Sequence, residues 1–179
     1  MCEYPEHDVN EIVKGVWLGN LASAYDQGFL HNYKIKYILT LYENFDNNKK
    51  YPGITYLTLL IRDKDMCGKD MTEFFNKTNA FIINALNKKE GILIHCRKGH
   101  HRSGAVTCAF LIKHYRLSYE EAIRYVNKLR PCAMRKPKCM AKDLFKYSLL
   151  IKGLPVCGNI ECGNPSAKCQ NSYYRCFCK

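Results

Sequence analysis

A cysteine and an arginine with the spacing Cys-x5-Arg lie in a basic loop between two apolar runs. Residues 92–104 read ILIHCRKGHHRSG, so Cys96 ends the first run and Arg102 precedes the second. A strand, a tight loop and a helix in this order turn backbone N–H groups inward at a helix N-terminus, where they bind anions and favour the thiolate form of a cysteine. The guanidinium of Arg102 can bind two oxygens of a phosphate above the sulfur. The pattern therefore predicts a phosphate-binding loop with a cysteine nucleophile.

The elements that must position this loop follow from the pattern of apolar residues. Apolar, largely β-branched runs predict strands at 13–20, 35–41, 54–61 and 92–95. Apolar positions at helical spacing predict helices at about 21–30, 72–86, 103–115, 118–129 and 141–151. The alternation predicts an α/β fold with a central, mostly parallel sheet of four to five strands flanked by helices. Because ligands bind at the carboxyl ends of parallel strands, the loop after Ile61 should face the same crevice as Cys96.

The loop and several segments around it resemble one known family. His95-Cys96-x5-Arg102-Ser103 resembles the signature of the protein tyrosine phosphatase superfamily. Four further segments resemble the framework of the dual-specificity phosphatases: GVWLGN at 15–20, LTLLIRD at 57–63, FF at 74–75 and RP at 130–131. The resemblance covers about residues 10–151 and implies a protein tyrosine phosphatase-like fold. No counterpart of the loop that deepens a phosphotyrosine pocket is evident, so the resemblance implies a shallower site that also accepts phosphoserine and phosphothreonine.

The resemblance implies a role for each residue of the loop. Cys96 would attack phosphorus and form a phosphocysteine intermediate, while Arg102 and the loop amides stabilise the charge on the equatorial oxygens. Ser103 would donate its hydroxyl to the sulfur, and His95 would orient the loop and help to set the acidity of the thiol. The residues expected to bind the substrate phosphate are Arg97, Lys98, Gly99, His100, His101 and Arg102. No metal and no cofactor are expected.

An acid must protonate the leaving oxygen, and the charged loop after residues 54–61 offers Asp63 and Asp65. Counted from the end of the strand, Asp63 falls where the family has its acid, whereas counting back from Phe74-Phe75 favours Asp65. We expect Asp63 to be the acid, because strand ends fix position better than loops do. Asp70 precedes a helix and is expected to cap it.

Other interpretations of the loop remain open. Cys96 could be an inert buried thiol, although the glycine, arginine and serine at matching offsets argue against this. A zinc site is disfavoured, because zinc ligands usually come as separated pairs and the cations of the loop would repel a metal; its ligands would be His95, Cys96, His100 and His101. A phosphate-binding module without catalysis would usually lack the cysteine, the arginine or the aspartate, and all three are present. A lipid or nucleic-acid binder with incidental catalysis is the competing class.

The formal net charge of +12 predicts anionic substrates or partners. Phosphorylated proteins are the expected substrates, and the cationic loop keeps phosphoinositides and RNA 5′-phosphates open as alternatives. A second basic cluster surrounds a single acid, Asp143, and could dock an acidic protein, RNA or a membrane surface. Its members are Lys128, Arg130, Arg135, Lys136, Lys138, Lys142 and Lys146.

The chain is expected to divide into a catalytic domain at 1–152 and a basic, Cys-rich tail at 153–179. Five of the eleven cysteines lie after Pro155, in a segment with few aliphatic residues that is expected to be disordered or to bind a metal. The polar N-terminus resembles no signal peptide, and no apolar run is long enough to span a membrane. We therefore expect the protein in the cytoplasm or the nucleus, with its cysteines as thiols or metal ligands.

Overall fold

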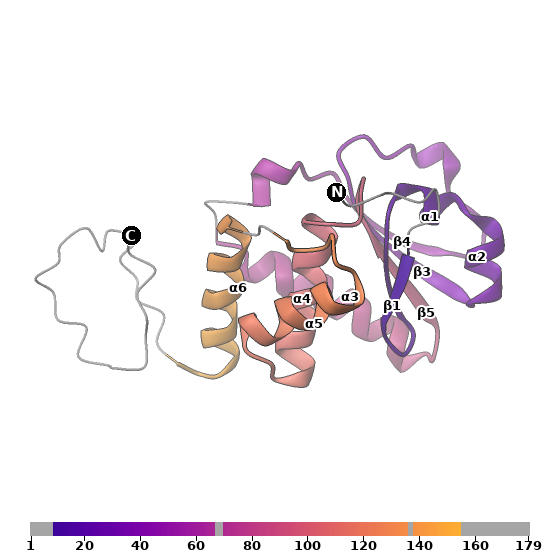
Figure 1. Cartoon of the computed structure of the whole chain (residues 1–179). Coiled ribbons are helices and arrows are strands. Elements are labelled where there is room, and N and C mark those ends of the chain that lie inside the picture. Colours follow the sequence, from indigo (N-terminus) through magenta and orange to yellow (C-terminus); the bar gives the residue numbers. More distant parts are fainter. Residues whose placement is uncertain (1–8, 67–69, 136–137, 155–179) are drawn as a thin grey trace, which may run out of the picture.

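The strand that precedes Cys96 lies in the middle of a five-stranded sheet (Figure 1). The computed structural model describes residues 9–66, 70–135 and 138–154. In order along the chain the strands are β1 (Val9–Val13), β2 (Val16–Gly19), β3 (Ile35–Leu41), β4 (Thr55–Leu59) and β5 (Gly91–His95). Their order in the sheet is β1-β2-β5-β3-β4; β1 runs antiparallel to β2, and the other neighbours are parallel. The predicted mostly parallel sheet is confirmed.

Two predicted elements are each divided in the structure. The strand predicted at 13–20 is the second arm of a hairpin, in which β1 and β2 are joined through Gly15 at φ 82°. The helix predicted at 21–30 consists of α1 (Leu21–Tyr25) and α2 (Gln27–Asn32). The chain breaks at Asp26, whose carboxylate accepts a hydrogen bond from the Phe29 N–H at 2.9 Å and so begins a new helix.

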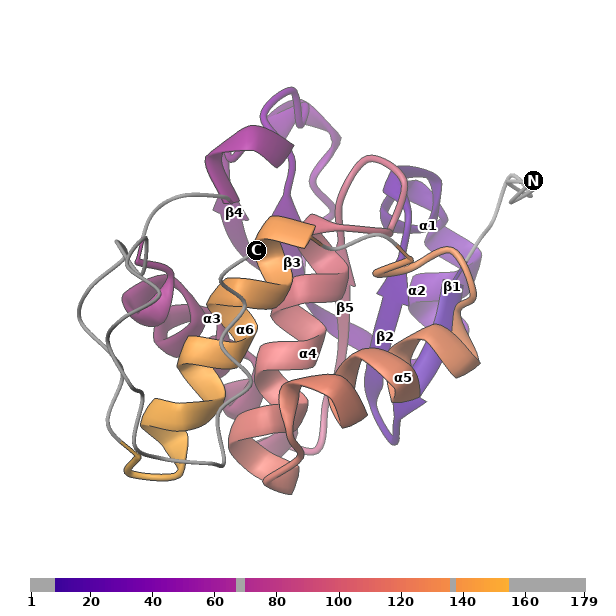
Figure 2. The ribbon, with the colours of Figure 1, turned by 60° about the vertical axis from the view of Figure 1, so that its left-hand side comes forward.

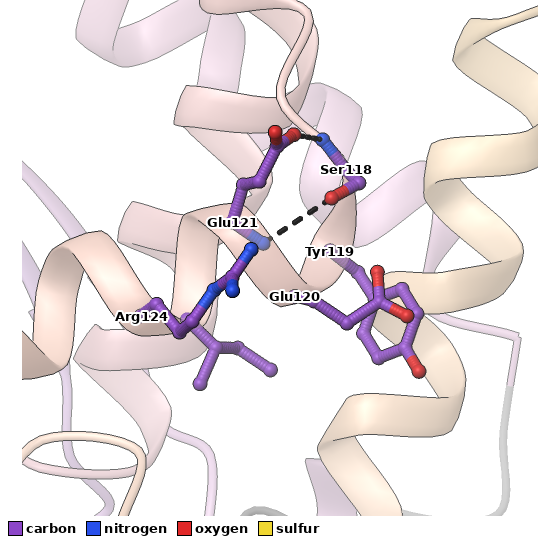
Figure 3. A pocket seen from close by; sticks show the side chains of 6 residues that line it. Ser118, Tyr119, Glu120, Glu121 and Arg124 are labelled. Carbon is purple, nitrogen blue, oxygen red and sulfur yellow. Dashed lines mark hydrogen bonds between the residues drawn. The ribbon is translucent and has the colours of Figure 1, made fainter.

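The longer helices agree with the predicted pattern. They are α3 (Thr72–Asn87), α4 (Arg102–Tyr115), α5 (Tyr119–Leu129) and α6 (Lys138–Ile151), and two short 3-10 helices are η1 (Asn47–Lys49) and η2 (Asp63–Met66). Figure 3 shows the capping box that opens α5. The Glu121 N–H donates to Ser118 Oγ at 3.2 Å, and the Ser118 N–H donates to Glu121 Oε2 at 2.7 Å. Asp70 accepts from the Thr72 N–H at 2.8 Å, just before α3.

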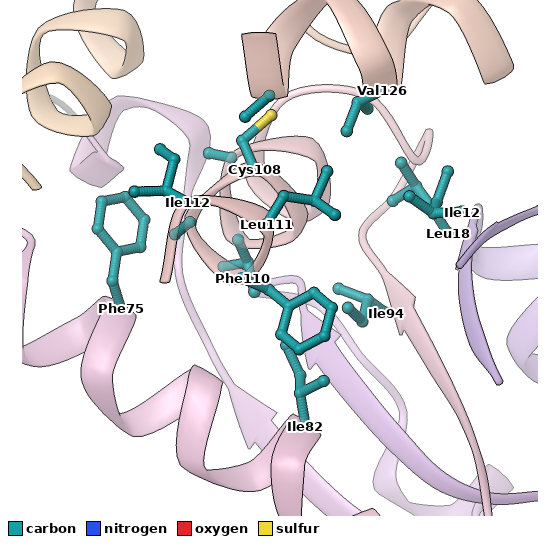
Figure 4. Packing of buried hydrophobic residues seen from close by; sticks show 14 of the residues in the cluster. Ile12, Leu18, Phe75, Ile82, Ile94, Cys108, Phe110, Leu111, Ile112 and Val126 are labelled. Carbon is teal, nitrogen blue, oxygen red and sulfur yellow. The ribbon is translucent and has the colours of Figure 1, made fainter. Parts of the chain in front are cut away.

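The sheet is covered on both faces, by α3 to α6 on one side and by α1 and α2 on the other (Figure 2). Successive residues of β5 alternate between these two cores: Ile92 and Ile94 pack on the side of α3 and α4, and Leu93 packs on the side of α1 and α2. Helix α4 is buried without interruption from residue 102 to residue 112, and Phe110 and Leu111 lie at the centre of the larger core (Figure 4). The N-terminus of α4 is thereby fixed next to the end of β5.

Residues 155–179 lie outside the described part of the chain, and with them nearly all of the predicted tail. Within the described ranges, each helix is either too short or too polar to cross a lipid bilayer.

Candidate active site

The parallel strands end at one edge of the sheet, and each delivers a residue of the site there. Cys96 follows β5, Glu43 lies two residues after β3, and Asp63 lies four residues after β4. β2 ends at Gly19, against which the loop after Cys96 packs. The crevice expected from the strand pattern therefore holds Cys96 and Asp63, as predicted, and also Glu43, which the sequence analysis missed.

Cys96 lies at the floor of the loop, with only 3% of its surface exposed. The Ser103 hydroxyl, in the first turn of α4, donates a hydrogen bond to the Cys96 sulfur at 3.2 Å. This is the contact that the resemblance implied for Ser103. A hydroxyl in this position stabilises negative charge on the sulfur.

His95 anchors the end of β5 to β3. Its Nε2 shares a hydrogen bond of 2.8 Å with the hydroxyl of Thr40, its partner in the neighbouring strand. The ring is completely buried, and this burial lowers the pKa of His95 to about 3. His95 is therefore neutral at physiological pH, and it can orient the loop but brings no positive charge to it.

Arg130 holds the phosphate loop from behind. Its guanidinium is 2% exposed and donates to the carbonyl oxygens of Gly99 at 2.7 Å and Lys98 at 3.3 Å, and to the Asn10 side-chain oxygen at 2.9 Å. The expectation that Arg130 belongs to a basic surface cluster around Asp143 is wrong, because both side chains are buried and Asp143 is only 8% exposed. The Arg-Pro pair at the end of a helix was the available signal, but its long-range partners could not be read from it.

Gly99 is a point where the loop passes close to the end of β2. Its φ is +68°, in the left-handed region that glycine favours. A Cβ atom here would lie 2.4 Å from the carbonyl oxygen of Gly19 and 2.7 Å from a guanidinium nitrogen of Arg130. A residue with a side chain would therefore force the loop away from both supports.

Arg102 is surrounded by acceptors on the crevice side. Its Nη1 donates to the Ile61 carbonyl oxygen at 2.8 Å and to the carboxylate of Glu43. Its Nε lies 3.0 Å from Asp63 Oδ1 and forms an ion pair with it, without a well-aligned hydrogen bond. The guanidinium also lies 5.5 Å from the centre of the Tyr42 ring. Two carboxylates thus approach the group that was predicted to bind phosphate.

The two candidate acids differ in where they point. Asp63 Oδ2 lies 3.1 Å from His101 Nδ1, so its carboxylate spans His101 and Arg102. The hydrogen bond from His101, and after it the charge of Arg102, lowers the pKa of Asp63. Asp65 instead pairs with Arg62, whose Nε and Nη2 lie 2.8 and 3.1 Å from it. The geometry therefore places Asp63 against the loop and Asp65 against a neighbour in its own turn.

The remaining loop residues are not equivalent. Arg97 and Lys98 are exposed, whereas His100 is 9% exposed and lies beside His101, with ring centres 6.3 Å apart. The alternative of a zinc site gains no support from the geometry, since His95 Nε2 faces Thr40 rather than Cys96. Within the described ranges, no three His, Cys, Asp or Glu side chains gather as metal ligands would.

The arrangement of the sheet and its helices matches that of several solved structures. Human DUSP28 matches with a TM-score of 0.72 and 23% identity, covering 80% of this chain and 95% of that one. PTPMT1, solved in complex with PI(5)P, matches with a TM-score of 0.69 and 20% identity, covering 81% of this chain and 97% of that one. These likenesses confirm the protein tyrosine phosphatase-like fold.

Residues 16–148 match the family model described as "Dual specificity phosphatase, catalytic domain", and the chain belongs to this family. Dual specificity protein phosphatase 7 of Homo sapiens is 33% identical over 119 residues, which are 66% of this chain and 28% of that protein. Dual specificity protein phosphatase 1B of Arabidopsis thaliana is 28% identical over 130 residues, 73% of this chain and 76% of that protein. The match spans only about half, 56%, of another curated relative, from Dictyostelium discoideum.

Proposed function

We propose that this protein hydrolyses phosphate monoesters of phosphorylated proteins, on tyrosine and on serine or threonine, through a phosphocysteine intermediate. One observation carries the proposal: Cys96 receives a hydrogen bond from Ser103 at the floor of a loop whose arginine pairs with Asp63. A nucleophile, a phosphate-binding cation and a carboxyl group are the three parts that this reaction needs. Membership of the dual-specificity phosphatase catalytic-domain family supports the same activity.

In the first step the Cys96 thiolate attacks phosphorus, so that an S–P bond forms while the P–O bond to the substrate breaks. Asp63 gives its proton to the departing oxygen. In the second step water attacks phosphorus, Asp63 takes a proton from that water, and the S–P bond breaks to release phosphate. Ser103 stabilises the departing thiolate through its hydrogen bond. Arg102 and the loop amides bind the equatorial oxygens throughout.

We infer that the substrate phosphate binds where Asp63 and Glu43 approach Arg102. A dianionic phosphate replaces Asp63 and Glu43 as the partner of the guanidinium, because it offers two oxygens in a fork-matched geometry. The displaced Asp63 then lies beside negative charge, which favours its protonated form. Substrate binding thus converts Asp63 from an ion-pair partner into the acid of the first step.

The experiment that tests this proposal compares the wild type with Cys96→Ser, Asp63→Asn and Asp65→Asn on a phenyl phosphate. We expect Cys96→Ser to lose at least about 10⁴-fold in kcat, since the nucleophile is removed. Asp63→Asn should lose about 10²-fold or more, whereas Asp65→Asn should stay within about threefold. Persistent turnover by Cys96→Ser would overturn the mechanism, and a loss confined to Asp65→Asn would reverse the assignment of the acid.

A phosphoinositide is the second candidate substrate. Arg97 and Lys98 are exposed cations within the loop itself, and they could bind a headgroup that carries more than one phosphate. The structural neighbour PTPMT1, solved in complex with PI(5)P, supports considering this class. Values of kcat/KM for phosphotyrosine and phosphothreonine peptides, phosphoinositides and triphosphate-ended RNA, measured side by side, decide between the substrates. A clear preference for lipid or RNA would overturn the protein substrate.

A further inference from the structure

His101 is placed to act on Asp63 rather than on its own helix. It is the N-cap residue of α4, yet its side chain makes no capping hydrogen bond there. Its Nδ1 instead lies 3.1 Å from Asp63 Oδ2, across 38 residues of sequence. Both side chains are about half exposed, at 40% and 52%, so they remain accessible to substrate and to water.

Four further charged or titratable groups face this pair. Arg102, Lys98 and His100 belong to the same loop, and Glu43 approaches from the end of β3. The positive charges of Arg102 and Lys98 disfavour a proton on His101, but its hydrogen bond to Asp63 outweighs them and raises the pKa of His101. The contact therefore favours a pair made of a carboxylate and an imidazolium, which together hold one proton.

We propose that His101 is a positioning residue that holds Asp63 over the phosphate loop and stores the proton that Asp63 delivers to the leaving group. This inference rests on the proposed phosphatase function. In the first step the proton passes from His101 Nδ1 to Asp63 and on to the departing oxygen, while the S–P bond forms and the P–O bond breaks. In the second step Asp63 takes a proton from the attacking water and returns it to His101, so the pair ends in its starting state.

The storage of a proton on the pair answers a difficulty of an aspartate acting alone. With an ordinary aspartate pKa, only about 0.1% of the carboxyl groups would be protonated at pH 7. A histidine that shares the proton keeps it within one hydrogen bond of the carboxylate up to the pH at which the imidazole itself deprotonates. The alkaline limit of activity should therefore follow His101.

The test compares His101→Asn and His101→Ser with the wild type, using phenyl phosphate and p-nitrophenyl phosphate. Asparagine keeps an N–H donor near the position of Nδ1 but cannot carry the proton as a charge. Serine also lacks the charge, and its side chain is too short to place a donor at that position. For phenyl phosphate, whose leaving group needs a proton, we expect a loss of about 10- to 100-fold in kcat at pH 7.5 and an alkaline limb displaced to lower pH. For p-nitrophenyl phosphate, whose leaving group is stable as an anion, the loss should stay within about threefold. His114→Asn, at the exposed far end of α4, is the matched control and should leave both profiles unchanged.

Four outcomes would overturn the inference. An equal loss on both substrates would mean that His101 only shapes the loop, and superimposable pH profiles would mean that it holds no proton for the reaction. If the wild type hydrolyses neither substrate, the proposed function fails and this inference falls with it. A measurement independent of turnover is an NMR titration of His101, whose pKa should fall in Asp63→Asn; an unchanged value would show that the pair does not interact in solution.

Discussion

Arg130 supports the phosphate loop and Arg102 ends it, and the partners of the two arginines differ in kind. Arg130 donates to the carbonyl oxygens of Lys98 and Gly99, which belong to the backbone of the loop. Arg102 pairs with the side-chain carboxylates of Asp63 and Glu43, and the backbone acceptor that it contacts, the Ile61 carbonyl oxygen, lies outside the loop. Backbone acceptors cannot be exchanged without distorting the loop, whereas side-chain carboxylates can turn away when a phosphate arrives. The partners of a buried arginine, more than its burial, distinguish a structural role from a role in binding.

Of the variants that test this difference between the two arginines, Arg102→Lys should have the largest effect, and that effect should be on activity. A lysine is a single point charge and cannot bind two phosphate oxygens as a guanidinium does, so we expect kcat/KM to fall by about 10²- to 10³-fold. The free energy of unfolding should change by no more than about 1 kcal/mol, because the carboxylates can turn to water. Steady-state kinetics and urea denaturation measure the two quantities. If the kcat/KM of Arg102→Lys stayed within tenfold of the wild type, Arg102 would not be the residue that binds the phosphate.

Arg130→Lys should show the reverse pattern. A lysine ammonium cannot reach the carbonyl oxygens of Gly99 and Lys98 and the Asn10 side chain together, so we expect the free energy of unfolding to fall by about 2 to 4 kcal/mol. The remaining folded molecules should keep more activity than Arg102→Lys, since Arg130 reaches the backbone of the loop and not the phosphate. Urea denaturation, with kinetics normalised to the folded fraction, tests both statements. If Arg130→Lys kept its stability and lost its activity, Arg130 would have the same role in phosphate binding as Arg102.

Glu43→Gln should have the smallest effect, and it tests directly whether a carboxylate partner of Arg102 competes with phosphate. Glutamine keeps an oxygen acceptor for Arg102 but removes the negative charge that competes with phosphate. We expect inorganic phosphate to inhibit the variant about two- to fivefold more tightly, with kcat nearly unchanged. The inhibition constant of phosphate is the measurement, and Glu120→Gln on the exposed side of α5 is the control. Weaker inhibition would mean that Glu43 orients Arg102 rather than competing for it.

Local signals in the sequence were sufficient for the parts of this molecule that depend on near neighbours. The apolar run before Cys96 gave β5, the capping-box pattern gave the start of α5, and strand ends placed Asp63 correctly beside the loop. The parallel sheet followed from the alternation of strands and helices. The strand and the helix start are decided within a few residues of the signals that predict them, whereas the sheet and the place of Asp63 follow from the order of strands and helices along the chain.

The features that sequence could not supply depend on contacts between distant segments. β1 lies against α5, where the Tyr125 hydroxyl donates to the Ile12 carbonyl oxygen across 113 residues of sequence. The break at Asp26 is the exception, because its capping contact with Phe29 is local. In the sequence Arg130 cannot be told from the other cations near it, because the carbonyl oxygens that it binds lie more than 30 residues away. The same reasoning about strand ends that selected Asp63 could have selected Glu43, which follows β3 at the same edge of the sheet.

The neutral histidine beside the nucleophile has a consequence for behaviour in acid. An unfolded chain binds a proton at a histidine near pH 6.5, but folded His95 resists protonation until about pH 3. Because the folded-state pKa lies below the unfolded one, the stability that His95 contributes is complete above pH 6.5. It is lost as the pH falls toward 3, by about 1.4 kcal/mol for each pH unit. Acidification below about pH 6.5 should therefore lower the free energy of unfolding of this protein, and urea denaturation at neutral and at acidic pH measures the loss.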